Sequence, residues 1–142
     1  HCARSRGRAR LKKQIDVVGA VIVQDGKVLC AQRGPDGYLP YMWEFPGGKI
    51  EAGETSREAL QREIDEELLC VVEVGDQVEV TTHEYDFAII TLTTFYCALL
   101  QGEPQLTEHA QVRWATPDDL SALDWAPADV PAVKQIQRDL AS

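Results

Sequence analysis

The sequence predicts an α/β protein, a mixed α/β sandwich, and three observations support this fold class. Two β-rich runs open the chain, a helical segment occupies its middle, and longer strand-like runs with a last helix follow. At 142 residues the chain has the length of about one domain. Its 44% hydrophobic and 26% charged residues are typical of a globular protein.

The first strands are expected at residues 15–23 and 27–32, two β-rich runs. Asp25-Gly26 lies between them and is a strong signal for a two-residue hairpin turn. Residues 34–41 are rich in turn-forming types and predict an exposed loop. A short strand is expected at residues 43–45.

The central helix is expected to begin at Thr55, which forms a capping box with Glu58, and to run to Leu69. Three strands are predicted after it, at residues 71–83, 87–100 and 111–115. Pro117 then suggests the start of a short helix. A last helix is predicted over about residues 130–140.

The charge of the chain is unevenly distributed. Residues 1–13 carry six basic side chains and no acid, so residues 14–142 have 8 basic and 23 acidic groups and a net charge of −15. A body this acidic does not attract a polyanion by its overall field, so we expect no nucleic-acid partner. A phosphate-bearing substrate would need a bound cation to reverse the local sign of the charge.

We predict residues 1–13 to be a basic disordered tail and residues 14–142 to be a single domain. The alternative for the tail is an arm that binds nucleic acid. No apolar run reaches the length that crosses a bilayer, and the N-terminal residues lack the apolar core of a signal peptide. We therefore expect no membrane association and, by default, a cytoplasmic protein.

The central helix has carboxylates where a buried helix usually has none. Its apolar seam spans about 80° of the helical wheel and consists of Leu60, Ile64 and Leu68. Directly beside this seam are Glu63, Glu66 and Glu67. Carboxylates three and four positions apart repel one another by a few tenths of a kcal/mol, and by more at low dielectric. Hard oxygen ligands suit Mg²⁺ or Mn²⁺, so the pattern indicates a metal site, with a solvated acidic face as the alternative.

A glycine-bearing loop leads into this helix over residues 47–54. Gly47 and Gly48 allow the backbone to approach a phosphate closely or to turn its carbonyl groups toward a metal. The alternative is an ordinary turn between a strand and a helix.

The segment from Gly48 to Cys70 resembles the Nudix box, Gly-x5-Glu-x7-Arg-Glu-U-x-Glu-Glu-x-Gly-U, where U is an apolar residue. Every charged position matches. The one departure is Leu69, where the family usually has glycine, and we expect it to change the exit turn of the helix but not the chemistry. Residues 28–33, 43–49 and 125–131 resemble the MutT and CTP pyrophosphohydrolase branch, and the likeness covers about residues 15–140.

The resemblance implies a Nudix-type α/β/α sandwich with a mixed central sheet and a Mg²⁺ cofactor, for which Mn²⁺ could substitute. The implied metal ligands are Gly47, through its carbonyl group, and Glu63, Glu66, Glu67 and Glu108. The three helix glutamates are also the catalytic residues, and Glu63 is expected to activate the attacking water. Arg62 is expected to brace them by ion pairs.

The implied substrate-binding residues are Arg33, Glu44, Phe45 and Asp129. Three of the implied site residues have plainer alternatives. Glu108 could be an exposed loop acid, Arg33 a surface arginine at a strand end, and Asp129 the N-cap of the last helix. No role is expected for His109.

The implied reaction hydrolyses a nucleoside triphosphate to the monophosphate and pyrophosphate, with possible use in sanitising the nucleotide pool. An ionised Asp129 would only accept hydrogen bonds, which favours the amino group of cytosine over the carbonyl group of uracil. Cytosine nucleotides are therefore expected first and oxidised purines second. The alternatives are another nucleoside-diphosphate-linked substrate or a catalytically silent nucleotide sensor. The protein is expected to be a monomer or a homodimer.

Overall fold

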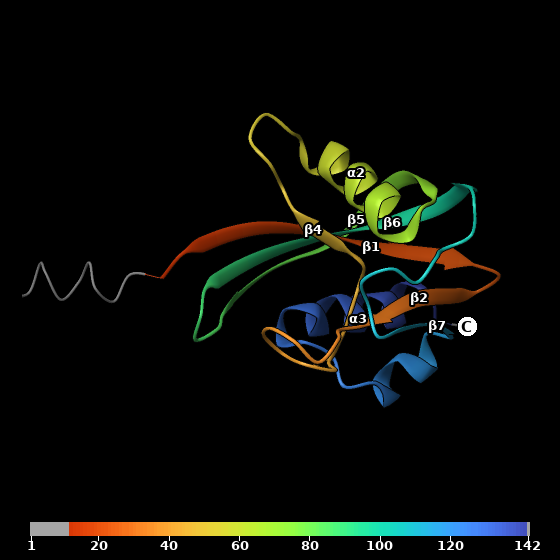
Figure 1. The fold of residues 1–142 in the computed structure, drawn as a ribbon. Coiled ribbons are helices and arrows are strands. Elements are labelled where there is room, and N and C mark those ends of the chain that lie inside the picture. The colour runs from red at the N-terminus through yellow and green to blue at the C-terminus, as the bar shows by residue number, and fades with distance from the viewer. Residues whose placement is uncertain (1–11, 142) are drawn as a thin grey trace, which may run out of the picture.

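A mixed sheet with an α-helix on each side forms the body of the protein (Figure 1), as seen in the computed structural model, which describes residues 12–141. The predicted tail, residues 1–13, falls mostly on residues 1–11, which lie outside the described residues. Lys12, which we had grouped with the tail, lies on the fold. Its ammonium group is 2.8 Å from a carboxylate oxygen of Glu84 and donates a hydrogen bond of 2.8 Å to the carbonyl oxygen of Tyr85.

Strand β1 (Gln14–Gln24) is the central strand of the sheet. It pairs in parallel with β6 (Ile89–Gln101) along one edge. Along the other edge it pairs antiparallel with β4 (Gly47–Lys49) near its middle and with β2 (Lys27–Gln32) at its end. Because β1 pairs with β2, β4 and β6, it joins the part of the sheet that contains β6 to the part that contains β2.

The remaining strands extend the sheet at both sides. Strand β5 (Val71–Glu84) pairs antiparallel with β6, while β3 (Trp43–Glu44) and β7 (Gln111–Ala115) both pair antiparallel with β2. The parallel β1–β6 pair among antiparallel neighbours confirms the mixed sheet. The predicted hairpin is also present, because Asp25 (φ 53°) and Gly26 (φ 75°) adopt the two positive φ angles of a type I′ turn.

The two helices, α2 (Ser56–Leu68) and α3 (Val130–Asp139), cover opposite faces of the sheet (Figure 1). Alternation along β1 explains this arrangement, since successive strand residues point to opposite faces. Ala20 and Ile22 pack in the core under α2, whereas Val21 packs in the core under α3. The apolar seam predicted for α2, formed by Leu60, Ile64 and Leu68, is completely buried.

Helix α2 begins with the predicted capping box. The Thr55 hydroxyl group accepts a hydrogen bond from the Glu58 amide at 3.1 Å, and the Glu58 carboxylate accepts one from the Thr55 amide at 2.9 Å. The short helix expected near Pro117 is a 3-10 helix, η1 (Asp118–Ala122), and a second one, η2 (Pro127–Asp129), precedes α3. Neither α-helix of the described residues is long and apolar enough to cross a membrane.

The end of α2 differs from our expectation. Leu69 adopts the left-handed conformation, with φ 56° and ψ 39°, and its amide donates to the Asp65 carbonyl oxygen. This is the backbone that a glycine would provide, so the expected change in the exit turn is wrong. The turn is retained, and the leucine bears a strain of about 1–2 kcal/mol.

Leu69→Gly should therefore raise the free energy of unfolding by about 0.5–1 kcal/mol, since relief of the strain exceeds the added entropy of the unfolded chain. Little packing is lost, because Leu69 is 58% exposed. Urea denaturation measures the change. Leu69→Ala is the matched control, and it should not stabilise the protein because alanine keeps the Cβ atom. A glycine variant no more stable than the wild type would contradict the strain.

Candidate active site

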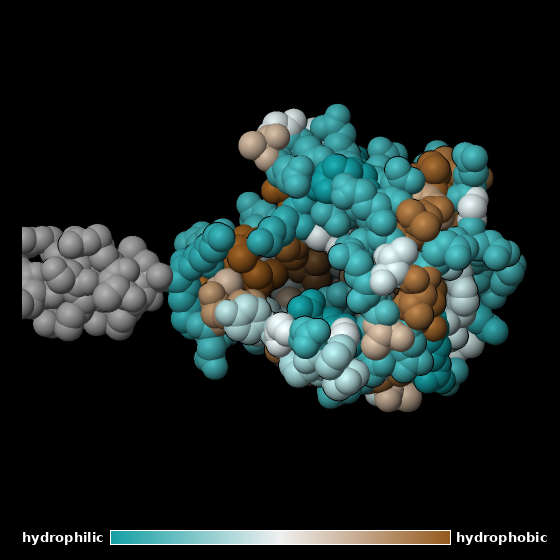
Figure 2. All heavy atoms as spheres, viewed as in Figure 1, coloured by the Kyte–Doolittle hydropathy of each residue, from teal (hydrophilic) through white to brown (hydrophobic). Residues whose placement is uncertain are grey.

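A cleft of about 520 Å³ lies between helix α2 on one side and the β2–β3 loop and η2 on the other. Figure 2 shows it as a hollow near the centre of the visible face, with apolar side chains inside. Strands β1 and β4, helix α2, the β2–β3 loop, the β5–β6 turn and η2 all contribute to its walls. Seven of the nine predicted site residues line it: Arg33, Glu44, Phe45, Gly47, Glu67, Glu108 and Asp129.

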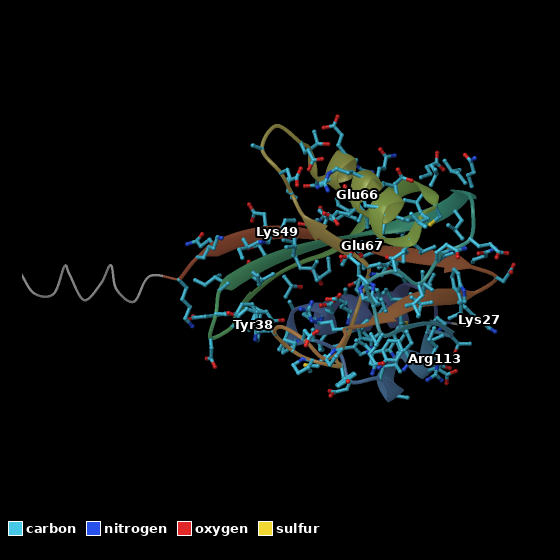
Figure 3. All side chains as sticks on the ribbon, viewed as in Figure 1. Lys27, Tyr38, Lys49, Glu66, Glu67 and Arg113 are labelled. Atoms are coloured by element: carbon cyan, nitrogen blue, oxygen red, sulfur yellow. The ribbon has the colours of Figure 1, made fainter. Side chains whose placement is uncertain are left out.

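The three glutamates of α2 differ in their surroundings. Glu67 lines the cleft with only 8% of its surface exposed, and its Oε1 atom is buried with no hydrogen-bond partner among the described residues. Glu63 lies against β4, where a Cβ atom at Gly48 would overlap its carboxylate. Glu66 is outside the cleft lining, and its side chain is 57% exposed. In Figure 3, Glu67 lies below Glu66, on the side of α2 that faces the middle of the molecule.

Arg62 braces the carboxylates, as the sequence indicated. Its Nε atom lies 2.6 Å from Glu54, and its Nη1 atom lies 2.9 Å from Glu63 and 3.4 Å from Glu66. Its Nη2 atom donates to the Lys49 carbonyl oxygen at 3.0 Å. These ion pairs raise the pKa of Arg62 further above its usual value. Arg62 thus fixes the orientation of Glu63 and links α2 to the loop that precedes it.

Burial raises the pKa of Glu67 to about 9, and the neighbouring Glu63 carboxylate adds to the shift. The charges of Glu44 and Glu108 raise it further. Although Glu108 is exposed, it therefore lies close enough to act on Glu67. Within residues 12–141, no group of three His, Cys, Asp or Glu side chains is close enough together to hold a metal ion. The unpartnered oxygen of Glu67 and the convergent negative charges nonetheless fit a divalent cation.

On the opposite wall, an ion pair and a hydrogen bond hold the Arg33 side chain, so it is not a free surface arginine. Its Nη1 atom lies 3.0 Å from Glu44 Oε1, and its Nε atom donates to the Tyr38 carbonyl oxygen at 2.8 Å. The other carboxylate oxygen of Glu44 is 3.0 Å from His109 Nε2. The side chain of His109 is only 8% exposed and lines the cleft. We had expected no role for this histidine, although its place next to Glu108 was a signal.

Asp129 accepts a hydrogen bond of 3.0 Å from the Phe45 amide and does not cap α3 with its side chain. Asp129 nevertheless stands at the N-cap position of α3, so this alternative is borne out in position but not in hydrogen bonding. Burial raises the pKa of Asp129 to about 8, the Phe45 amide opposes the shift, and the charge of Glu44 adds to it. The expected preference for cytosine requires an ionised Asp129, and burial in the nucleotide-free protein disfavours that ionisation. The protonated acid can also donate a hydrogen bond.

Three aromatic residues that we had not predicted also line the cleft. Tyr38, in the β2–β3 loop, stacks on Phe87 with ring centroids 3.8 Å apart and an angle of 14°. Phe87 stacks in turn on Tyr85 at 5.1 Å and 13°. The Tyr85 hydroxyl group accepts a hydrogen bond of 2.8 Å from the Ala128 amide, next to Asp129. The cleft thus combines an acidic end with an aromatic wall.

Residues 17–135 match the family model described as the NUDIX domain. The chain belongs to the Nudix family. This Nudix hydrolase is 38% identical over 122 residues to the CTP pyrophosphohydrolase of Escherichia coli, covering 86% of this chain and 90% of that protein. It is 41% identical over 133 residues to the putative 8-oxo-dGTP diphosphatase 2 of Mycobacterium tuberculosis, covering 89% and 90%.

Solved structures agree with this assignment. The solution structure of the Escherichia coli ORF135 protein superimposes with a TM-score of 0.82 at 37% identity, covering 92% of this chain and 93% of that one. The MutT protein of methicillin-resistant Staphylococcus aureus 252, a Nudix hydrolase, gives a TM-score of 0.76 at 53% identity, covering 91% and 99%. The predicted α/β/α fold is confirmed, and Nudix hydrolases generally use a divalent metal ion.

The raised pKa of Glu67 predicts how stability depends on pH. The folded protein keeps a proton on Glu67 that the unfolded chain releases above about pH 4.5, so stability is lost as the pH rises from about 4.5 to about 9. Glu67→Gln removes this loss. In the presence of a chelator the variant should exceed the wild type by about 1–3 kcal/mol at pH 8.5 and match it near pH 4.5.

Chemical denaturation at the two pH values measures this difference. Glu66→Gln is the matched control, because Glu66 is largely exposed and its neutralisation should not produce a pH-dependent gain. A Glu67→Gln variant that tracks the wild type at both pH values would show that Glu67 is ionised in the folded protein.

Proposed function

We propose that this protein is a Mg²⁺-dependent nucleoside triphosphate pyrophosphohydrolase, with Mn²⁺ as a substitute, that converts a (d)NTP and water to the (d)NMP and pyrophosphate. One observation carries the proposal. A single cleft joins a buried carboxylate with an unpartnered oxygen, Glu67, to an aromatic wall that ends at Asp129. Those two ends suit a metal-bound triphosphate and a nucleobase. The names of the relatives, a CTP pyrophosphohydrolase and an 8-oxo-dGTP diphosphatase, support the same class of substrate.

The metal would be held by Glu63, Glu66 and Glu67, with the Gly47 carbonyl group and Glu108. When bound, the cation supplies charge neutralisation of the triphosphate, polarisation of the attacked phosphorus and a lower pKa for the nucleophilic water. Glu63 accepts the proton of that water. Its ion pair of 2.9 Å with Arg62 keeps its carboxylate in a fixed position for this step.

Two cationic side chains among the described residues, Arg33 and Lys49, line the cleft and could bind the phosphates of a substrate. Lys49, on β4, is on the side of the cleft near α2 (Figure 3). Arg33 projects from the end of β2, and its planar guanidinium group can bind a phosphate through two parallel hydrogen bonds. The aromatic wall supplies stacking for the base, which contributes about 1–3 kcal/mol in comparable sites.

Phosphate analysis with a nucleotide panel tests the function. The wild type should release pyrophosphate from dCTP, dUTP and 8-oxo-dGTP only when Mg²⁺ or Mn²⁺ is present, and Glu67→Gln should lose at least about a hundredfold in kcat. Wild-type turnover in that variant would contradict the metal assignment. Hydrolysis of nucleoside-diphosphate sugars alone, or nucleotide binding without turnover, would favour the two alternative functions.

Asp129 is proposed to contact the edge of the base, and its raised pKa makes base preference depend on pH. Below about pH 8 the acid both donates and accepts, so it tolerates cytosine and uracil. Above that pH it only accepts, which favours the amino group of cytosine. The ratio of kcat/KM for dCTP to that for dUTP should rise about three- to tenfold between pH 6.5 and 9.

The ratio cancels pH effects that both substrates share. Asp129→Asn is isosteric and does not titrate, so its ratio should be the same at both pH values. If the wild-type ratio is equally flat, Asp129 does not discriminate between the two bases by its charge.

A further inference from the structure

Residues 105–110 are the last part of the connection between β6, which ends at Gln101, and β7, which begins at Gln111, and two of them, Glu108 and His109, line the cleft. At one end this connection is tied to the last turn of α2. The Gln105 amide donates a hydrogen bond of 2.8 Å to the Leu68 carbonyl oxygen, and the Thr107 hydroxyl group donates to the carbonyl oxygen of Glu67. The connection is therefore anchored to the helix that carries the proposed metal ligands.

At its other end the connection is tied to the opposite wall of the cleft, which contains Arg33 and Glu44. The Ala110 amide donates a hydrogen bond of 2.8 Å to the Gln32 carbonyl oxygen, at the end of β2. His109 reaches β3, where its Nε2 atom lies 3.0 Å from Glu44. The second oxygen of Glu44 holds Arg33 at 3.0 Å. One carboxylate thus links a histidine from this connection to an arginine at the end of β2.

The direction of these contacts follows from the chemistry of the groups. An ionised carboxylate only accepts hydrogen bonds, so His109 must carry a proton on Nε2 and donate it to Glu44. Two other carboxyl groups lie near Glu44, since its charge raises the pKa of both Glu67 and Asp129. Without two donors, the Glu44 carboxylate would be free to rotate away from these neighbours and would release Arg33.

We propose that His109 is a positioning residue, which fixes the Glu44 carboxylate and through it holds the guanidinium group of Arg33 in the cleft. The inference rests on the proposed function, because it assigns His109 to the binding of the same substrate. His109 is buried on the cleft wall, and it acts on the substrate through Glu44 and Arg33. Its loss should therefore weaken binding more than it slows the chemical step.

Two substitutions of His109 separate positioning from packing. His109→Leu keeps most of the volume but removes the donor, and it should raise KM for dCTP about tenfold with kcat reduced less than about threefold. His109→Gln carries an amide nitrogen that can replace Nε2, and its KM should be within about threefold of the wild type. Equal losses in the two variants would overturn the proposal.

Gln111→Leu is the matched control. It removes a neighbouring side-chain hydrogen bond of 2.8 Å, from Gln111 to Gln32, at the start of β7 and outside the cleft lining. Its KM should equal that of the wild type. Thermal melting of each variant checks that the fold is intact.

A double-mutant cycle tests the route through Arg33. If His109 acts by holding Arg33, then His109→Leu should change KM less than about twofold in an Arg33→Ala background. A further tenfold rise in that background would mean that His109 acts independently, and the proposal would be wrong.

One measurement does not depend on activity. The ¹⁵N resonances of the His109 imidazole should show a proton on Nε2 in the wild type, whether or not Nδ1 is also protonated. An unprotonated Nε2 would exclude donation to Glu44 and overturn the inference. If the wild type hydrolyses no nucleotide, the proposed function fails, while this spectrum still decides whether His109 holds Glu44.

Discussion

The cleft depends on how closely strand β4 approaches its neighbours. A Cβ atom at Gly47 would overlap the Val18 carbonyl oxygen of β1, and one at Gly48 would overlap the Glu63 carboxylate. Only glycines allow both contacts, so β4 can pair with β1 and still leave room for the glutamates of α2. The acidic end of the cleft exists because these two residues have no side chains. A larger residue at Gly47 would push β4 away from β1, and one at Gly48 would displace Glu63 of α2.

The site also concentrates charge that the fold would not otherwise tolerate. Burial makes ionisation unfavourable for both Glu67 and Asp129, and the charge of Glu44 disfavours it further at each. Arg62 compensates the charges of Glu63 and Glu66, and Arg33 compensates that of Glu44. A protein selected for stability alone would not keep two such acids in one cleft. Their local conflict with the fold is the pattern expected where binding and chemistry, and not packing, determine the residue.

Much of this molecule could be predicted from its sequence. The Asp25-Gly26 hairpin, the Thr55 capping box and the carboxylates of α2 each depend on residues that are close together in the chain. The missed features depend on distant residues. His109 meets Glu44 across 65 positions, and the stacking of Tyr38 on Phe87 requires the sheet to bring a loop and a turn together. The raised pKa of Asp129 was missed for the same reason, since it depends on burial. The turn at Leu69 shows that a fold can impose a backbone conformation against local preference.

The central place of β1 affects how this chain folds. β1 is the first strand of the described chain, yet its longest pairing is the parallel one with β6, from Gln14 with Ile89 to Ile22 with Cys97. Each of those contacts closes a loop of 75 residues, so their entropy must be overcome before the sheet gains its stability. During synthesis, β1 can form only its hairpin with β2 and its short pairing with β4 until β6 has left the ribosome. The chain therefore has a high contact order, and we expect it to fold slowly for its size and largely after most of it has been made.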